Sequence, residues 1–348
     1  MLIPYVNADA SLLTSDASAS SLGAVARLGV ASEVFVALPL SALSAPAALA
    51  AKPLLRAARV FAGPFSAGDT DSALAWLDAG ALAVWFDADA AAGAETPTSI
   101  SAIAEALCGL PTSRVFVRVL CATLEAGADM PSVELEAALR ALSGAAAGFI
   151  VPAAALPNAA ALRAVSAAAP RSRLFYAPSA GAPLAAAEVG RLHRGEGDVC
   201  APAFVSASAA DAEAGGARGV VCVGTALAFC VRSDRTDGLF TTVVADEFGK
   251  ALGLVYSSRE SVAEAVRAGR GVYYSRSRNG LWRKGDTSGN HQILRSIALD
   301  CDADALLFTV KQIGEPPAFC HLSTRTCWGE DGGLSALEVR QKPLRSKN

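Results

Sequence analysis

The chain has 348 residues, and 52% of them are hydrophobic, which is enough apolar surface for a large core and two domains. Its formal net charge of -3 argues against bulk electrostatic binding to nucleic acid. No apolar run is long enough to span a membrane, and no positively charged, apolar leader follows Met1. Because the cysteines also lack paired spacing, we expect a protein of the reducing cytoplasm, with no nucleic-acid or membrane partner.

The first 230 residues alternate between apolar runs of strand length and alanine-rich amphipathic segments, such as 70–79 and 133–142. The strand-like runs are 2–6, 33–38, 59–62, 82–86, 115–120, 148–151, 173–176 and 219–223. This alternation predicts an α/β domain over residues 1–230, in which a parallel sheet closes as a (β/α)8 barrel. An open doubly wound sheet is the alternative, and the apolar patch at 199–205 is either another strand or a short insertion.

Residues 231–330 have the pattern of a smaller α+β domain, mostly antiparallel. A predicted hairpin covers 237–256, an amphipathic helix follows at 257–268, and the next strand covers 271–277. Residues 331–348 are interpreted as a tail or a truncated linker.

Basic and hydroxyl side chains are concentrated at the end of the predicted strand 271–277 and in the residues that follow it. Arginine forks, a lysine, hydroxyls and glycines are typical of a phosphate-binding segment, and a tryptophan offers a stacking surface. The predicted substrate-binding residues are Arg276, Ser277, Arg278, Trp282, Lys284, Thr287, Ser288, Gly289 and Asn290. An exposed basic hairpin is the alternative, but the metal-binding pattern that follows favours a small anionic substrate.

Acidic residues and cysteines follow in a second cluster. Interpreted as a strand, residues 300–304 place Asp300, Asp302 and Asp304 on one face, where a hard cation such as Mg²⁺ would neutralise them. Cys301 lies on the other face. With Cys320 and Cys327 it would form a three-thiolate zinc site that keeps one coordination position open for catalysis.

Two interpretations give this cluster no function: the aspartates would form a solvated strand edge, and the cysteines would act as small buried hydrophobic residues. The spacing from Cys301 to Cys320 is too long for a compact zinc knuckle, so the ligands must come from separate elements or separate subunits. His321 adjoins a predicted zinc ligand, and its pKa range suits a general acid or base. The alternative is a histidine that only orients the site.

Three motifs together resemble phosphoribosyl-AMP cyclohydrolase of histidine biosynthesis. They are the run Ser-Arg-Ser-Arg-x-x-Leu-Trp-x-Lys-Gly-x-Thr-Ser-Gly from Ser275, the Asp-Cys-Asp-x-Asp run, and Cys-His-x5-Cys. With the lead-in at 232–239, they are most similar to the cyclohydrolase segment of the fungal trifunctional proteins. The departures from the bacterial pattern, Asp286 and Leu322, leave the metal ligands untouched.

The resemblance implies zinc- and magnesium-dependent opening of the adenine ring of phosphoribosyl-AMP, with His321 as the acid or base. It also implies a homodimer, in which Cys301 of one subunit and Cys320 with Cys327 of the other complete each zinc site.

The first domain is weakly similar to the isomerase barrel of the same pathway at 2–7, 60–87 and 219–227. Asn7 stands where that isomerase carries its first catalytic aspartate, and an amide cannot act as an acid or base near neutral pH. We therefore expect a degenerate, non-catalytic barrel that serves as a scaffold or regulatory module. Two other functions remain possible: a bifunctional chain with an isomerase barrel, and a binding module with a structural zinc site.

Overall fold

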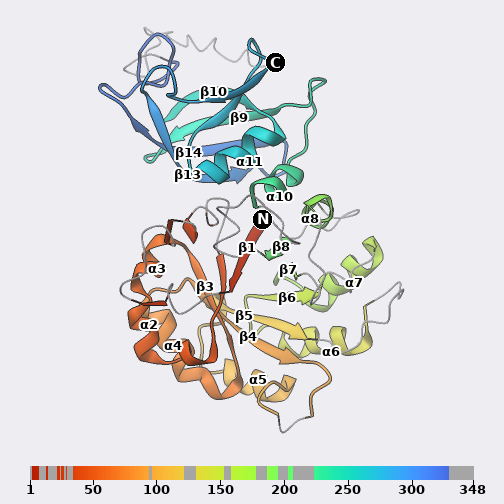
Figure 1. Ribbon diagram of the computed structural model, residues 1–348. Helices are drawn as coiled ribbons and strands as arrows, with labels where there is room; N and C mark the ends of the chain where they lie inside the picture. Colours follow the sequence, from red (N-terminus) through yellow and green to blue (C-terminus); the bar gives the residue numbers. More distant parts are fainter. Residues whose placement is uncertain are drawn as a thin grey trace, which may run out of the picture.

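The computed structural model divides the chain between two sheets, one on each side of a short buried helix (Figure 1). It describes residues 2–7, 13–14, 22–23, 25–26, 29, 34–93, 96–120, 131–152, 158–177, 186–194, 203–206 and 223–328. None of the helices within these ranges is both long and apolar enough to cross a membrane.

The first sheet is parallel throughout, and its strands follow one another in chain order. They are β1 (Leu2–Asn7), β2 (Val34–Ala37), β3 (Val60–Phe65), β4 (Ala83–Asp89), β5 (Val115–Leu120), β6 (Gly148–Pro152), β7 (Arg173–Ala177) and β8 (Ala203–Ser206). Strand β8 pairs back onto β1, from Leu2 with Ala203 to Tyr5 with Ser206, so the sheet closes into a barrel. The eighth strand comes from the apolar patch that the sequence left ambiguous. The sequence placed the last strand at 219–223 instead. Val223 is the first residue of a helix, and 219–222 lie outside the described residues.

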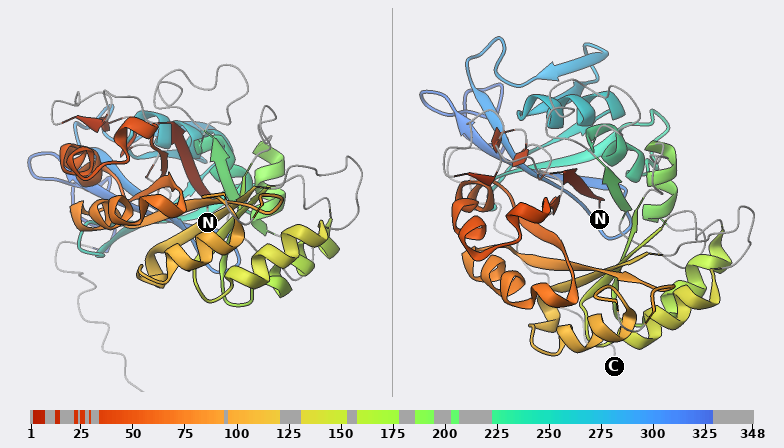
Figure 2. Two further views of the ribbon diagram at one scale, coloured as in Figure 1. Left: turned by 90° about the horizontal axis from the view of Figure 1, so that it is seen from below. Right: turned by 60° about the horizontal axis from the view of Figure 1, so that its bottom comes forward.

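Helices surround this sheet, as the alternating pattern predicts (Figure 2). They are α2 (Ala45–Ala50), α3 (Lys52–Ala57), α4 (Thr70–Ala79), α5 (Ile100–Leu107), α6 (Val133–Leu142), α7 (Ala159–Ala168), α8 (Ala186–Arg194) and α10 (Val223–Cys230). Several begin at side-chain caps that satisfy otherwise unpaired backbone amides. The Ser99 hydroxyl accepts a hydrogen bond from the Ala102 amide, and Ser132 does the same for Leu135.

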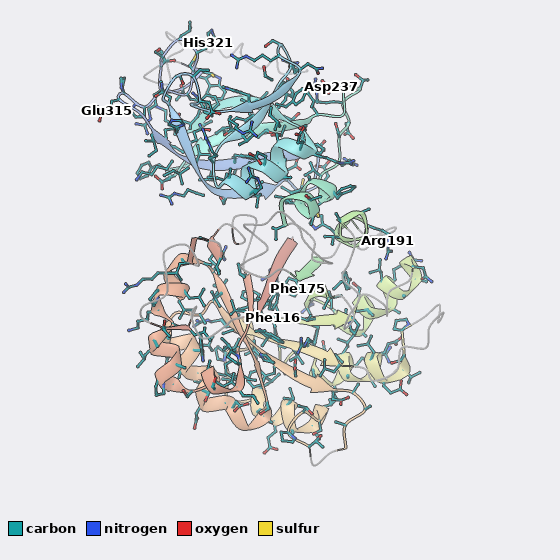
Figure 3. The ribbon with its side chains drawn as sticks, viewed as in Figure 1. Phe116, Phe175, Arg191, Asp237, Glu315 and His321 are labelled. Carbon is teal, nitrogen blue, oxygen red and sulfur yellow. The ribbon has the colours of Figure 1, made fainter. Side chains whose placement is uncertain are left out.

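Aromatic side chains fill the inside of the barrel, where alternate residues of the strands point inward. Phe35, Phe61, Trp85, Phe116 and Phe175 form a separate buried cluster, in which the Phe35 and Phe61 rings lie 4.8 Å apart and edge to face. Figure 3 shows Phe116 and Phe175 within this interior. The intervening strand residues pack instead against the helices.

The second sheet has six strands in the order β12-β11-β10-β9-β14-β13. They are β9 (Phe240–Asp246), β10 (Ala251–Ser257), β11 (Val272–Ser275), β12 (Gly280–Arg283), β13 (His291–Leu299) and β14 (Ala305–Ile313). All neighbours are antiparallel except β9 and β14, which pair in parallel from Thr241 with Ala305. The predicted hairpin at 237–256 forms as β9 and β10.

Helix α11 (Arg259–Ala268) follows β10 and begins two residues later than predicted. Its start is a capping box, in which the side chains of Ser258 and Ser261 each accept a hydrogen bond from the other residue's backbone amide. Gly269, with φ of 63°, ends the helix in the left-handed region, which glycine adopts without strain.

Helix α10 joins the two parts of the chain, because it packs on α8 of the first domain and on α11 of the second. Gly224 allows the close approach to α11: a Cβ there would lie 2.8 Å from the Cα of Ala263. The Arg259 guanidinium lies 4.7 Å from the centre of the Phe229 ring across the same contact. One continuous apolar core therefore runs through α10 into both domains.

Candidate active site

Residues 314–328, called here the cysteine loop, follow β14 and turn back against β10. The Cys327 amide donates to the Leu252 carbonyl at 2.8 Å, which attaches the end of the loop to the sheet. Within the loop, the Cys320 amide donates to the Thr324 carbonyl at 3.1 Å. This turn brings Cys320 and Cys327 together at the side of the second domain that faces away from the barrel, where Figure 3 shows His321.

The two thiols of the loop have different environments. The Leu322 amide hydrogen-bonds to the Cys320 sulfur and, with the Thr324 hydroxyl, lowers the pKa of that thiol against the effect of burial. Burial raises the pKa of Cys327, and the nearby Cys320 charge raises it further. The Nδ1 atom of His321 lies 3.8 Å from the Cys320 sulfur, so the predicted acid or base adjoins the pair.

Lys284 lies beneath the cysteine loop and is 5% exposed. Its Nζ atom donates to the Ala318 carbonyl at 3.3 Å and lies about 6 Å from the ring centres of Trp282 and Phe319. Burial lowers the pKa of this lysine, while the charges of Cys327 and Cys320 oppose that shift. A desolvated ammonium next to two thiols is favoured when the thiols are ionised.

Gly253 of β10 leaves the space that the loop occupies, and it supplies a testable prediction. A Cβ at this position would collide with the Phe319 ring and lie 3.0 Å from the Cys327 sulfur. We expect Gly253→Ala to lower the free energy of unfolding by about 1–3 kcal/mol, measured by denaturant titration, because the loop must move. Ala251→Ser, at an exposed position of the same strand, is the control and should change stability little. Unaltered stability of Gly253→Ala would mean that the loop does not pack on β10.

The three aspartates lie in the turn between β13 and β14, so their assignment to a strand is wrong. The Asp300 carboxylate accepts hydrogen bonds from the amides of Asp304 and Ala305 at 3.0 and 3.1 Å, which closes the turn, and Ala303 adopts a left-handed φ of 62°. Carboxylate oxygens of Asp300, Asp302 and Asp304 nevertheless lie within 4.8 Å of one another. The turn, rather than the alternation of a strand, brings them together.

The carboxylates of Asp300, Asp302 and Asp304, called here the aspartate cluster, repel one another. Desolvation and the nearby Asp302 charge raise the pKa of Asp304. Burial acts in the same direction on Asp300, but hydrogen bonds from the Ala305 and Asp304 amides outweigh it and lower the pKa of Asp300. A divalent cation bound to the three carboxylates would relieve this repulsion.

Cys301 occupies the same turn and is exposed, away from the cysteine loop. Ala305, where β14 begins, pairs with Thr241 of β9, whereas Gly253 beside Cys327 pairs with Val244. The two places are thus about 10 Å apart along the strands and about 10 Å apart across them. Among the described histidines, cysteines and acidic residues, only the aspartate cluster forms a group of three metal-binding side chains. One chain therefore brings together two of the three predicted zinc ligands.

Apart from Lys284, described above, and Trp282, the predicted substrate-binding residues lie in two turns. Arg276, Ser277 and Arg278 form the turn between β11 and β12, and the Arg276 guanidinium lies 4.1 Å from the centre of the Tyr256 ring. Thr287, Ser288, Gly289 and Asn290 belong to the turn after β12, at its other end. The strand between them has 4 residues, which separates the two turns by about 13 Å. Trp282 lies on that strand and packs on Tyr273, with 5.7 Å between the ring centres.

The structure adds residues that sequence reasoning did not single out for the site. Arg235 lies 4.4 Å from the Tyr256 ring centre and makes a bidentate ion pair with Asp237, at 2.9 and 2.6 Å. The Tyr256 ring therefore contacts two guanidiniums, those of Arg235 and Arg276. In the sequence, the one local indication of this contact was Tyr256 on the half-exposed face of a predicted strand. The pairing of β9 with β10 is what brings Arg235 to this ring.

The family model of phosphoribosyl-AMP cyclohydrolase matches residues 253–329, which include the cysteine loop, the aspartate turn and both predicted substrate-binding turns. The chain is 61% identical over 109 residues to the histidine biosynthesis trifunctional protein of Saccharomyces bayanus, which covers 31% of this chain and 13% of the relative. It is 57% identical over 106 residues to the histidine biosynthesis bifunctional protein of Schizosaccharomyces pombe, covering 30% of this chain and 25% of the relative.

The chain covers most of the length of a shorter relative. The chain is 47% identical over 111 residues to the phosphoribosyl-AMP cyclohydrolase of Rhodospirillum centenum, which is 31% of this chain and 81% of that protein. By contrast, the chain spans only 13% of the length of the trifunctional relative from Saccharomyces bayanus.

Proposed function

Because the chain belongs to the phosphoribosyl-AMP cyclohydrolase family through its C-terminal domain, we propose that it hydrolyses the adenine ring of 1-(5-phosphoribosyl)-AMP in histidine biosynthesis. The observation that carries this proposal is the arrangement of the cysteine loop, where Cys320, Cys327 and His321 lie together over the buried Lys284. The two thiols are soft metal ligands, the His321 imidazole beside them can carry a proton, and solvent reaches this surface.

The donor atoms fit the two metals that the sequence predicted. Thiolates are preferred zinc ligands, and Cys320 and Cys327 supply two of them from one chain. The carboxylates of Asp300, Asp302 and Asp304 are hard oxygen ligands that suit Mg²⁺, and their oxygens lie within 4.8 Å of one another. Zinc bound at the thiolates would supply hydroxide near neutral pH, since it lowers the pKa of bound water to about 7.

The chain's own residues would then bind the substrate and move the proton. The water oxygen forms a bond to the adenine carbon that carries the exocyclic amine, and the bond from this carbon to the substituted ring nitrogen breaks. The imidazole of His321 takes one proton from the water and delivers it to that ring nitrogen. The second proton passes from the added oxygen to the exocyclic nitrogen as the carbon becomes a carboxamide, which balances the reaction for the neutral imino form of the substrate. Arg276 and Arg278, with the hydroxyls of Ser277, Thr287 and Ser288, would bind the two phosphates.

A second copy of the chain would complete each zinc site, because Cys301 is distant from the cysteine loop of its own chain. An uncovered apolar face of the second sheet supports this pairing. Leu254, Val243 and Leu307 lie in one row across β10, β9 and β14, and the two leucines are 50% and 40% exposed. A homodimer that buries this row would cover its apolar surface and bring Cys301 of one copy toward the loop of the other.

The first domain fits a degenerate (β/α)8 barrel of the isomerase type that serves as a scaffold. Its interior is filled by aromatic side chains. Near the carboxyl ends of the strands, Asp87 accepts two hydrogen bonds from the Arg118 guanidinium, both at 2.7 Å. Both oxygens of this carboxylate are therefore engaged by one guanidinium. The side chain of Asn7, on which the sequence argument rested, lies outside the described residues.

The direct test is an assay of the purified chain with phosphoribosyl-AMP, in which the ultraviolet absorbance change on ring opening is followed. We expect turnover that a zinc chelator abolishes and that added zinc restores. Failure of the zinc-loaded protein to open the ring, with its fold shown intact by circular dichroism, would refute the proposed activity.

The aspartate cluster supplies a second test of the same function. Replacing Asp300, Asp302 or Asp304 with asparagine should weaken the magnesium dependence and raise KM about tenfold or more, while the zinc content stays near normal. Asp78→Asn, which removes an exposed carboxylate on α4 of the barrel, is the control for loss of charge. Joint loss of zinc and magnesium would show that the two metal sites are not separate.

A further inference from the structure

The backbone of Ala318 is held on both sides by side chains from the turn at 284–290. Its amide donates to the Oδ1 atom of Asn290 at 3.0 Å, and its carbonyl accepts from the Nζ atom of Lys284 at 3.3 Å. Ala318 lies two residues before Cys320, and it is itself buried. One turn of the chain thus fixes the start of the segment that carries both thiols.

The surroundings of Lys284 suit this structural contact better than a contact with phosphate. A lysine that binds a phosphate of the substrate needs an accessible ammonium, whereas Lys284 is 5% exposed and its Nζ atom already donates to a backbone carbonyl. That carbonyl belongs to Ala318, and the sulfurs of Cys327 and Cys320 are close enough for their charges to act on the ammonium. A buried ammonium needs such partners, because an unpaired charge in an apolar environment is strongly unfavourable.

The Asn290 side chain also binds the cysteine loop. Its side-chain oxygen accepts the Ala318 amide, and Gly314 at the start of the cysteine loop leaves room for it, since a Cβ on Gly314 would collide with that oxygen. Two residues that the sequence placed among phosphate ligands are therefore engaged with the loop.

We infer that Lys284 and Asn290 are positioning residues for the Cys320–Cys327 pair, because together they clamp the Ala318 peptide from which the cysteine-bearing segment continues. This inference rests on the proposed function, because it specifies how the thiolate site of that function is held. It assigns neither residue to the phosphates of the substrate. The hydroxyls of Thr287 and Ser288, in the same turn, keep that role.

The test compares Lys284→Met and Asn290→Leu, which remove the two clamps, with Asn290→Asp, which keeps an acceptor oxygen for the Ala318 amide. Lys250→Met removes an exposed lysine of the same domain and is the control for loss of charge. The metal-free, full-length proteins are titrated with Co²⁺, whose thiolate complexes give a charge-transfer absorption. Amide hydrogen exchange over 314–328 is measured on the same metal-free samples.

In Lys284→Met and Asn290→Leu, we expect cobalt affinity to fall about tenfold and the thiolate-to-cobalt absorption to change. The amides of Cys320 and Cys327 should exchange about tenfold faster, because the loop has lost an anchor. In cobalt affinity and in loop exchange, Asn290→Asp and Lys250→Met should resemble the wild type. Substrate kinetics should show a lower kcat at a nearly unchanged KM in the two clamp variants.

The opposite pattern would overturn the inference: a raised KM in Lys284→Met with cobalt affinity, cobalt spectrum and loop exchange all as in the wild type would make this lysine a phosphate ligand. Failure of the proposed function gives a different result. If the wild type opens no adenine ring while the cobalt and exchange effects occur as expected, the activity is refuted and the positioning role stands. Unchanged exchange in both clamp variants would refute the clamp, whatever the activity.

Discussion

Replacing Cys320 or Cys327 with serine is expected to lower the rate of ring opening at least about a thousandfold. A serine hydroxyl is a far poorer zinc ligand than a thiolate, and two of the expected ligands come from this one loop. The initial rate with phosphoribosyl-AMP measures the effect, and metal analysis of the same samples should show that the zinc content falls with it.

Cys108→Ser is the matched control for these variants. Cys108 is an exposed cysteine of the barrel, and its sulfur donates to the Ala104 carbonyl of its own helix at 3.4 Å. Its loss should change neither rate nor zinc content. Wild-type turnover by the Cys320→Ser or Cys327→Ser protein, in buffer freed of zinc, would rule out the metal mechanism.

Mixing two inactive variants is expected to restore activity, which is the second large effect. Cys301→Ser and Cys320→Ser chains should each be inactive alone. In a mixed dimer, one site draws Cys301 from the Cys320→Ser chain and the cysteine pair from the Cys301→Ser chain, and this site is intact. Because random pairing makes half of the dimers mixed and each has one intact site of two, co-refolding should recover about a quarter of wild-type activity.

The position of Cys320 and Cys327 in one loop supplies a sharp control for this experiment. A mixture of Cys320→Ser and Cys327→Ser chains should recover nothing, because every loop in every dimer then lacks one thiol. Recovery in this control would show that the two cysteines serve different sites. If mixed dimers of Cys301→Ser and Cys320→Ser are present by mass spectrometry and remain inactive, Cys301 is not shared between subunits.

Local patterns predicted those elements whose stabilising contacts are close in sequence. The hairpin of β9 and β10 follows from alternating apolar residues around a tight turn, and α11 follows from the Ser258 cap, an apolar stripe and Gly269. The aspartate turn was misjudged because Asp-x-Asp-x-Asp alternates like a strand. Hydrogen bonds that the Asp300 carboxylate accepts from two backbone amides override that pattern, and they cannot be predicted from spacing alone.

By itself the sequence determined which chemical groups the protein possesses: thiols, carboxylates, a histidine and a basic, hydroxyl-rich segment, in a motif similar to one enzyme family. Only the tertiary structure decided how these groups are combined. It unites Cys320 with Cys327 but leaves Cys301 apart, and it buries Lys284 against Ala318, 34 residues further along the chain. The physical reason is that such contacts depend on the register of distant strands and on the return path of a loop. Both are set by packing of the whole domain rather than by neighbouring residues.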